Sequence, residues 1–222
     1  MKSIFGFFDW YNHSLKRPSD IKYPGKSYPI ISVLINVLLV AVSVTFIVTK
    51  VQESMARAMI GMTRMVSNNS AVHPPVPNPF LIFGILFASL LIAKLLYLVM
   101  AYLIKRWCIG KGKGFFHLFN SIVFRSNSMI IISIITALFV AFATPGSVLE
   151  MLRPWYLYTL LALFTLSNVI WQGSIIVTIV LDEGKAKFDK FYVAILALVS
   201  TTVVSFLISA TAMIIIHNSQ FF

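Results

Sequence analysis

Lys94 is the residue best placed to do chemistry, because it lies inside an apolar stretch that runs from Phe80 to Ile104. At the rise of an α-helix, about 15 Å or more separates it from either end of that stretch. A charged ammonium at this depth costs about 2.5–3.5 kcal/mol on insertion scales. Two interpretations stay open. Either the lysine snorkels or hydrogen-bonds to neighbouring amides, or it holds an anion such as a lipid phosphate or an anionic substrate.

Two amides, Asn168 and Gln172, lie one helical turn apart in a second apolar stretch, and Asn36 lies in a third. An amide without a partner in hydrocarbon costs several kcal/mol, so these side chains are expected to face protein. They either join neighbouring helices by hydrogen bonds or line a polar cavity together with Lys94. No Asp or Glu occurs in any of the long apolar stretches, so no internal carboxylate is available to pair with Lys94.

A stripe of small residues repeats every four positions in the last apolar stretch: Ala197, Thr201, Ser205 and Ser209. Small side chains let two helix backbones approach closely, and close van der Waals packing drives helix association in membranes. The stripe is therefore predicted to pack against another helix, either of the same chain or of a second copy.

The glycine-rich segment 110–114 carries Lys111 and Lys113. Its spacing differs from that of a phosphate-binding loop, so these lysines are expected to contact anionic lipid headgroups and not a nucleotide. The sequence contains no His-Glu-x-x-His motif, no Gly-x-Ser-x-Gly motif and no cluster of acidic residues. No catalytic site, metal or cofactor is expected.

The composition shows which elements position these side chains. Apolar residues make up 59% of the 222 residues and charged residues 11%, whereas soluble domains have about 45–50% and about 25%. Five stretches reach or approach the length needed to cross about 30 Å of hydrocarbon: 30–49, 80–104, 126–144, 155–181 and 191–216. The predicted fold is an all-α membrane protein, a five-helix transmembrane bundle with short amphipathic interfacial helices.

The basic residues predict the orientation of the bundle. Thirteen Lys and Arg residues lie on the side of the amino terminus and four on the opposite side. Because Lys and Arg accumulate on the cytoplasmic side, segment 1–29 is predicted to be cytoplasmic and the tail 217–222 extracytoplasmic, with domain 30–216 in the cell membrane. The net charge of +11 then meets anionic headgroups. No basic polar domain exists to bind nucleic acid.

Two cytoplasmic segments have apolar residues at helical spacing. These residues are Ile4, Phe8, Tyr11 and Leu15 in the first segment, and Phe115, Phe119 and Ile122 in the second. Each segment is predicted to form an amphipathic helix, and the first is predicted to lie in the membrane interface.

A third stripe follows the first span on the far side: Met55, Met59, Met62 and Val66. It predicts an interfacial extension of that span, and the alternative is a Met-rich binding surface. Glu53 is expected to pair with Arg57 one helical turn on.

The layout of residues 10–216 resembles the Yip domain family, five-span membrane proteins named for interaction with Ypt/Rab GTPases, and in particular its bacterial members. The matching features are the basic entry Lys16-Arg17-Pro18, the glycine-rich turn leading into an aromatic stretch at 110–124, Trp155 opening the fourth span, and the charged turn 181–190. The resemblance lies in layout and not in a diagnostic motif. It implies no catalytic residue, and without the long cytoplasmic tail of the eukaryotic members it does not imply Rab binding.

The expected function is that of a non-catalytic, Yip-like membrane scaffold or adaptor in membrane organisation or envelope homeostasis. Its partners would be the bilayer, anionic headgroups, and a protein partner or a second copy. The alternative is a small carrier or binder of an anionic lipid or solute that uses Lys94.

Overall fold

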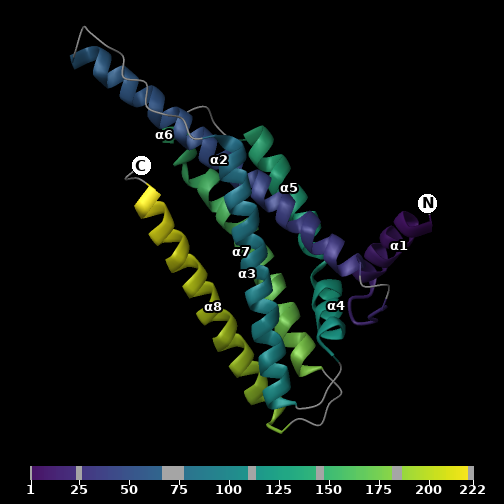
Figure 1. Cartoon of the computed structure of the whole chain (residues 1–222). Helices are drawn as coiled ribbons and strands as arrows, with labels where there is room; N and C mark the ends of the chain where they lie inside the picture. The colour runs from purple at the N-terminus through teal and green to yellow at the C-terminus, as the bar shows by residue number, and fades with distance from the viewer. Residues whose placement is uncertain are drawn as a thin grey trace. The chain divides into compact units, whose positions relative to one another are not determined.

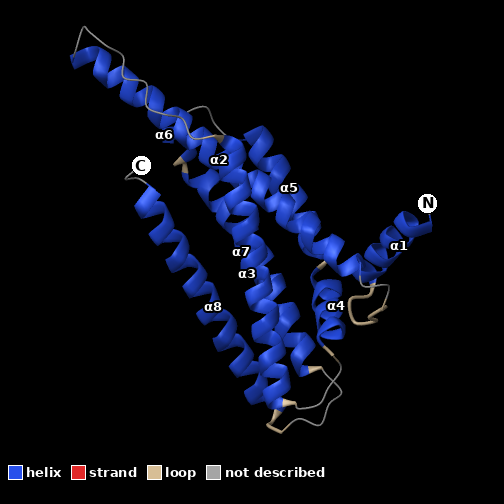
Figure 2. Cartoon of the chain, in the orientation of Figure 1, coloured by secondary structure: helices blue, strands red, loops and turns tan. Residues whose placement is uncertain are grey.

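The computed structural model describes residues 2–23, 27–66, 78–109, 114–143, 148–181 and 187–219. Helices make up most of these ranges, and no strand occurs in them (Figure 2). The prediction of an all-α membrane protein is confirmed by this content and by the long apolar helices described below.

Eight helices follow one another along the described ranges (Figure 1). They are α1 (Lys2–Lys16), α2 (Ser27–Val66), α3 (Pro79–Cys108), α4 (Phe115–Ser126), α5 (Ser128–Ala143), α6 (Val148–Met151), α7 (Pro154–Val180) and α8 (Lys190–Ser219).

Local sequence signals explain where the long helices begin. Proline is the first residue of α3 and of α7, a position where its missing N–H costs no hydrogen bond. Before α3, the side-chain oxygen of Asn78 accepts a hydrogen bond from the N–H of Phe80 at 3.0 Å. Before α8, the Asp189 carboxylate accepts one from the N–H of Phe191 at 2.7 Å. These side chains satisfy backbone donors that a helix start leaves without a partner.

Four helical segments are long and apolar enough to cross a bilayer: Ser27–Arg57, Pro79–Cys108, Pro154–Val180 and Lys190–Leu207. A fifth crossing requires α4 and α5 to be counted as one span with a 50° bend. The described part of the chain is thus that of a multi-pass membrane protein with four or five candidate crossings.

The predicted stretch 126–144 is divided in the structure by a break at Asn127. The helix that covers this stretch, α5, has 16 residues, about 24 Å at the α-helical rise, which is less than the hydrocarbon core of about 30 Å. The Ser126 hydroxyl donates to the carbonyl of Val123 at 3.2 Å, and such bonding back to the preceding turn bends helices. Asn127 then separates the two helices and is held by other parts of the chain, as described below.

The helix expected at 115–124 is present as α4, and its polar face is buried as well as its apolar face. Every residue of α4 from Leu118 to Phe124 is buried, on all sides of the helix. Phe119 and Ile122 are buried as expected, but so are Asn120 and Ser121. The cause is α1, which packs against α4 and, with the segment that follows it, covers the face that would otherwise meet water. α4 is therefore an interior helix.

The chain divides into two compact units, which are described separately. Unit 1 consists of Met1–Val33, Leu91–Ser128 and Asn168–Phe222, and unit 2 of Leu34–Leu90 and Met129–Ser167. Unit 2 has an apolar core in which Val140, Met151, Tyr156 and Leu160 pack together. In the same unit the Asn36 amide donates to the Ser133 hydroxyl at 2.8 Å, so α2 and α5 are joined by a buried polar contact.

Helix α2 continues well beyond the predicted first span, as one unbroken helix of 40 residues (Figure 1). Its length of about 60 Å is twice the thickness of the hydrocarbon core. The helix therefore continues without a break from the predicted first span through the Met stripe. Met55 is exposed there, and the side chains of the other three residues of the Met stripe lie outside the described part.

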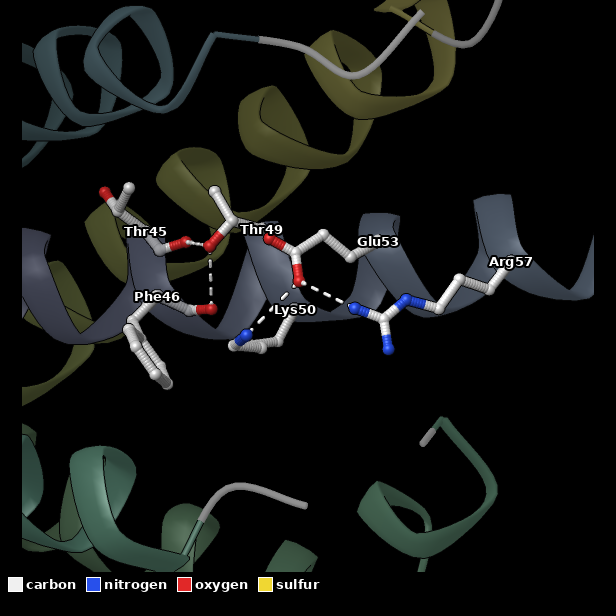
Figure 3. A network of polar contacts seen from close by, with 6 residues as sticks. All are labelled: Thr45, Phe46, Thr49, Lys50, Glu53 and Arg57. Carbon is white, nitrogen blue, oxygen red and sulfur yellow. Dashed lines mark hydrogen bonds and ion pairs between the residues drawn. The ribbon is translucent and has the colours of Figure 1, made fainter. Parts of the chain in front are cut away.

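The polar contacts along α2 change from hydroxyls to charges near Lys50 (Figure 3). The Thr49 hydroxyl donates to the backbone of the preceding turn. One turn on, Glu53 lies 3.2 Å from the Lys50 ammonium and 3.9 Å from the Arg57 guanidinium, which confirms the predicted pairing of Glu53 with Arg57. This change from hydroxyls to charged side chains indicates that the hydrocarbon-facing part of α2 ends near Lys50.

The orientation can be checked by cysteine labelling in a Cys108→Ala background. A cysteine at Ser70 is expected to react with an impermeant maleimide from outside intact cells. Cysteines at Ser19 and Gly184 are expected to react only after permeabilisation, because basic residues cluster on their side. Accessibility in the reverse sense at these positions would contradict the predicted orientation. Ser70 and Gly184 lie outside the described residues, but the label reports only the side of the membrane.

Candidate functional site

Lys94 has an aromatic partner within unit 1. Its ammonium lies 3.7 Å from the ring centroid of Trp171 on α7. A cation over the face of an indole is stabilised by the ring quadrupole, by about 2 kcal/mol or more where water is excluded. This contact offsets much of the insertion cost of the charge. Within the described part of the chain, the Lys94 ammonium makes no hydrogen bond and no ion pair in addition to this cation–π contact.

Sequence reasoning missed this role of Trp171, although a signal was present. A charged residue in an apolar span needs a partner, and the spans contain no carboxylate. Besides amide and hydroxyl oxygens, the face of an aromatic ring is a side-chain group that attracts a cation. Trp171 lies between Asn168 and Gln172 in the sequence, the two amides that are predicted to face protein.

The two amides belong to a hydrogen-bond network centred on Ser205 of α8. The Gln172 amide donates to the Ser205 hydroxyl at 2.9 Å and, at 3.4 Å, to the side-chain carbonyl of Asn168. The Ser205 proton is directed to the backbone carbonyl of Thr201 at 2.9 Å. The Tyr97 hydroxyl of α3 therefore donates to the Ser205 oxygen. One serine thus links α3, α7 and α8.

The predicted polar site is therefore assembled in two parts. Gln172 and Asn168 bond to each other, while Lys94 contacts the ring of Trp171, the residue next to Gln172. No hydrogen bond within the described residues joins Lys94 directly to either amide. Gln172 thus joins α7 to α8 through its hydrogen bond to Ser205. The N–H groups of Lys94 have no acceptor among the described residues.

The small-residue stripe lies on a buried face of α8 for most of its described length. Ala197 and Thr201 are both 0% exposed, and Ser205 is held by Tyr97 and Gln172 of the same chain. The side chain of Ser209 lies outside the described part. In the described residues the stripe thus contacts other helices of its own chain.

A second polar cluster in unit 1 joins three segments at the break between α4 and α5. The Asn127 amide nitrogen donates to the Ser14 hydroxyl of α1 at 2.7 Å, and the Ser32 hydroxyl of α2 donates to the Asn127 carbonyl oxygen. Asn127 is 2% exposed and both serines are also buried. Asn127, at the break between α4 and α5, is therefore a junction that binds both α1 and the start of α2.

Aromatic rings and one backbone carbonyl complete this junction. Trp10 packs edge to face against Phe124, with ring centroids 5.6 Å apart. The carbonyl oxygen of Lys22 accepts hydrogen bonds from the Trp10 indole at 3.3 Å and from the Asn120 amide at 3.1 Å. Helix α1 and the chain that follows it are thus fixed to α4 at several points.

Helix α1 consequently has three faces. Trp10 and Ser14 face the protein and are buried. The predicted apolar stripe lies on the flank, where Phe8 is exposed and Tyr11 and Leu15 are half-buried. This burial raises the pKa of the Tyr11 phenol above its ordinary value. The remaining face is exposed and mixed in character, and it consists of Phe5, Asp9, Asn12 and Lys16.

Other predicted contacts cannot be placed. Lys111 and Lys113, the candidate headgroup contacts, lie outside the described residues. Within the described ranges, no group of three or more His, Cys, Asp or Glu residues is arranged to hold a metal ion.

Lys94→Leu is expected to leave the protein as stable as the wild type or slightly more stable. The substitution removes a charge whose insertion costs about 2.5–3.5 kcal/mol and loses a cation–π contact of about 2 kcal/mol, so the two terms nearly cancel. Thermal unfolding in a mild detergent measures the difference. A loss of more than about 2 kcal/mol would show that Lys94 is a structural requirement.

Comparisons of the chain with protein-family models, with curated proteins and with solved structures find no match. Its resemblance to the Yip domain family therefore stays a prediction from the layout of the sequence.

Proposed function

We propose that this protein is a non-catalytic scaffold of the cell membrane that presents helix α1 to a protein partner on the cytoplasmic side. The role is similar to that expected of Yip-like adaptors in membrane organisation or envelope homeostasis. The observation that carries the proposal is the junction at Asn127, which fixes α1 to the interior helix α4 through buried Ser14.

A fixed helix suits this function because binding then costs little conformational entropy. The exposed face of α1 combines an aromatic side chain, Phe5 at 73% exposure, with acidic, amide and basic groups at Asp9, Asn12 and Lys16. Aromatic anchors bordered by polar groups are typical of protein interfaces. The flank at Phe8 and Leu15 has the apolar character that suits the membrane interface.

The proposal is tested by photo-crosslinking in the native membrane. A photoreactive amino acid at Asn12, on the exposed mixed face, is expected to give one discrete protein adduct. The same group at Leu15, on the apolar flank, is expected to give lipid adducts. Trp10→Ala removes the ring that packs on Phe124 and is expected to abolish the adduct at Asn12. Lipid adducts alone at Asn12, or a protein adduct unaffected by Trp10→Ala, would reject the scaffold function.

A further inference from the structure

The packed faces of α3 and α7 both open at the level of Lys94. Within unit 1, the buried residues of α3 begin at Tyr97, one turn after Lys94, and continue toward Cys108. On α7 no residue from 161 to 170 is buried, and burial resumes at Trp171, one turn after Asn168, which is exposed. Lys94 and Asn168 therefore lie at the edge of the packed region, on the same helix faces that are buried below them.

Hydrogen-bond donors without acceptors collect at this edge. The Lys94 ammonium carries three N–H groups, and within the described residues none of them makes a hydrogen bond. Trp171 is 2% exposed, and its indole nitrogen is buried without an acceptor in the described part of the chain. The Asn168 amide accepts a bond from Gln172 through its oxygen, while its nitrogen donates none within the described residues.

The contact between Lys94 and the Trp171 ring does not satisfy these donors. The ring face attracts the charge of the ammonium but does not replace conventional acceptors for its N–H groups. A buried donor without a partner carries a desolvation penalty, and that penalty is relieved by an acceptor that enters the open edge. An oxyanion offers several acceptor positions and also neutralises the charge of Lys94.

We propose that Lys94 and Trp171, with the amide of Asn168, form an intramembrane site for a monovalent oxyanion carried on an apolar chain. The ligand is monovalent because Lys94 is the only charged residue between Phe80 and Ile104. It carries an apolar chain because the site lies within two apolar helices, whose exposed side chains meet hydrocarbon at this level. The site is separate from α1 and does not depend on the scaffold function.

Two sources supply this chemistry: the phosphodiester of an anionic phospholipid and the carboxylate of a fatty acid. Both place a single negative charge at the end of apolar chains. Purified protein is reconstituted into nanodiscs of phosphatidylcholine alone, of phosphatidylcholine with phosphatidylglycerol, or of phosphatidylcholine with oleate. Native mass spectrometry after gentle release then counts the anionic molecules retained per protein.

Three variants separate the site from general charge effects. Lys94→Leu removes the cation, and Trp171→Phe keeps an aromatic face but removes the indole N–H. Lys190→Leu, which removes the same charge from an exposed residue at the start of α8, is the matched control. Retention of phosphatidylglycerol or of oleate is expected to fall at least about tenfold in Lys94→Leu, and about tenfold in Trp171→Phe. It is expected to be unchanged in Lys190→Leu.

The outcomes are distinct. Retention of phosphatidylglycerol only, or of oleate only, with the expected loss in both site variants supports the proposal and identifies the source. Equal retention by the wild type and Lys94→Leu overturns it, and so does an equal loss in Lys190→Leu. If Lys94→Leu does not fold, Trp171→Phe decides alone, and unchanged retention in that variant overturns the proposal.

Discussion

Asn127→Leu is expected to lower the free energy of unfolding by about 2–4 kcal/mol. Asn127 bonds with Ser14 and with Ser32, and a buried hydrogen bond contributes about 1 kcal/mol while a buried group left without a partner costs about 1–3 kcal/mol. Leucine fills similar space but removes both bonds and leaves two serine hydroxyls buried. Unfolding by denaturant in mild detergent measures the change.

Limited proteolysis gives a second readout for the same variant. Release of α1 from α4 exposes the chain after Lys16, so trypsin is expected to cleave there faster in Asn127→Leu than in the wild type. Asn12→Leu, on the exposed face of α1, serves as the control and is expected to change stability by less than about 0.5 kcal/mol. Equal stability of Asn127→Leu and the wild type would mean that the junction does not hold α1.

Thr201→Leu is expected to destabilise the protein by about 1–3 kcal/mol, because a larger side chain must enter a fully packed position. Thr201 is 0% exposed, and its carbonyl oxygen accepts the hydrogen bond from Ser205. The adjacent Thr202 is exposed, so Thr202→Leu is a control with the same chemical change on the same helix. Thermal unfolding in detergent compares the two.

If α8 packs through the face that carries Thr201, Thr201→Leu and Thr202→Leu must differ in thermal stability. Thr202→Leu is expected to match the wild type, since leucine is well tolerated on a face that meets lipid. If Thr201→Leu is as stable as Thr202→Leu, then the face with Ala197 and Thr201 also meets lipid, and the small-residue stripe is not a packing surface.

The helices themselves could be predicted because their signal is local. Long apolar stretches indicate membrane helices by length and composition alone, and the sequence places most of the candidate spans near their positions in the structure. The start of α8 depends on a polar side chain as well as on apolarity. Apolarity places it at Phe191, while the Asp189 cap places the first helical residue at Lys190.

The partners of the polar side chains could not be predicted, because they depend on contacts far apart in the sequence. Asn127 bonds with Ser14, 113 residues away, and Tyr97 bonds with Ser205, 108 residues away. Hydrophobic periodicity describes the faces of one helix and contains no information on which other helix covers them. The burial of the polar face of α4 could not be predicted for this reason, since Asn120 and Ser121 contact the segment that follows α1.

The length of α2 has a mechanical consequence. The part after Thr49 extends for about 25 Å at the α-helical rise and continues, in one helix, a segment that is long and apolar enough to cross a bilayer. Transmembrane helices tilt to match the thickness of the hydrocarbon layer, and a change in tilt of about 10° moves the tip of a segment of this length sideways by about 4 Å. In such a tilt helix α2 would act as a lever, and a change in bilayer thickness would displace the far end of the helix.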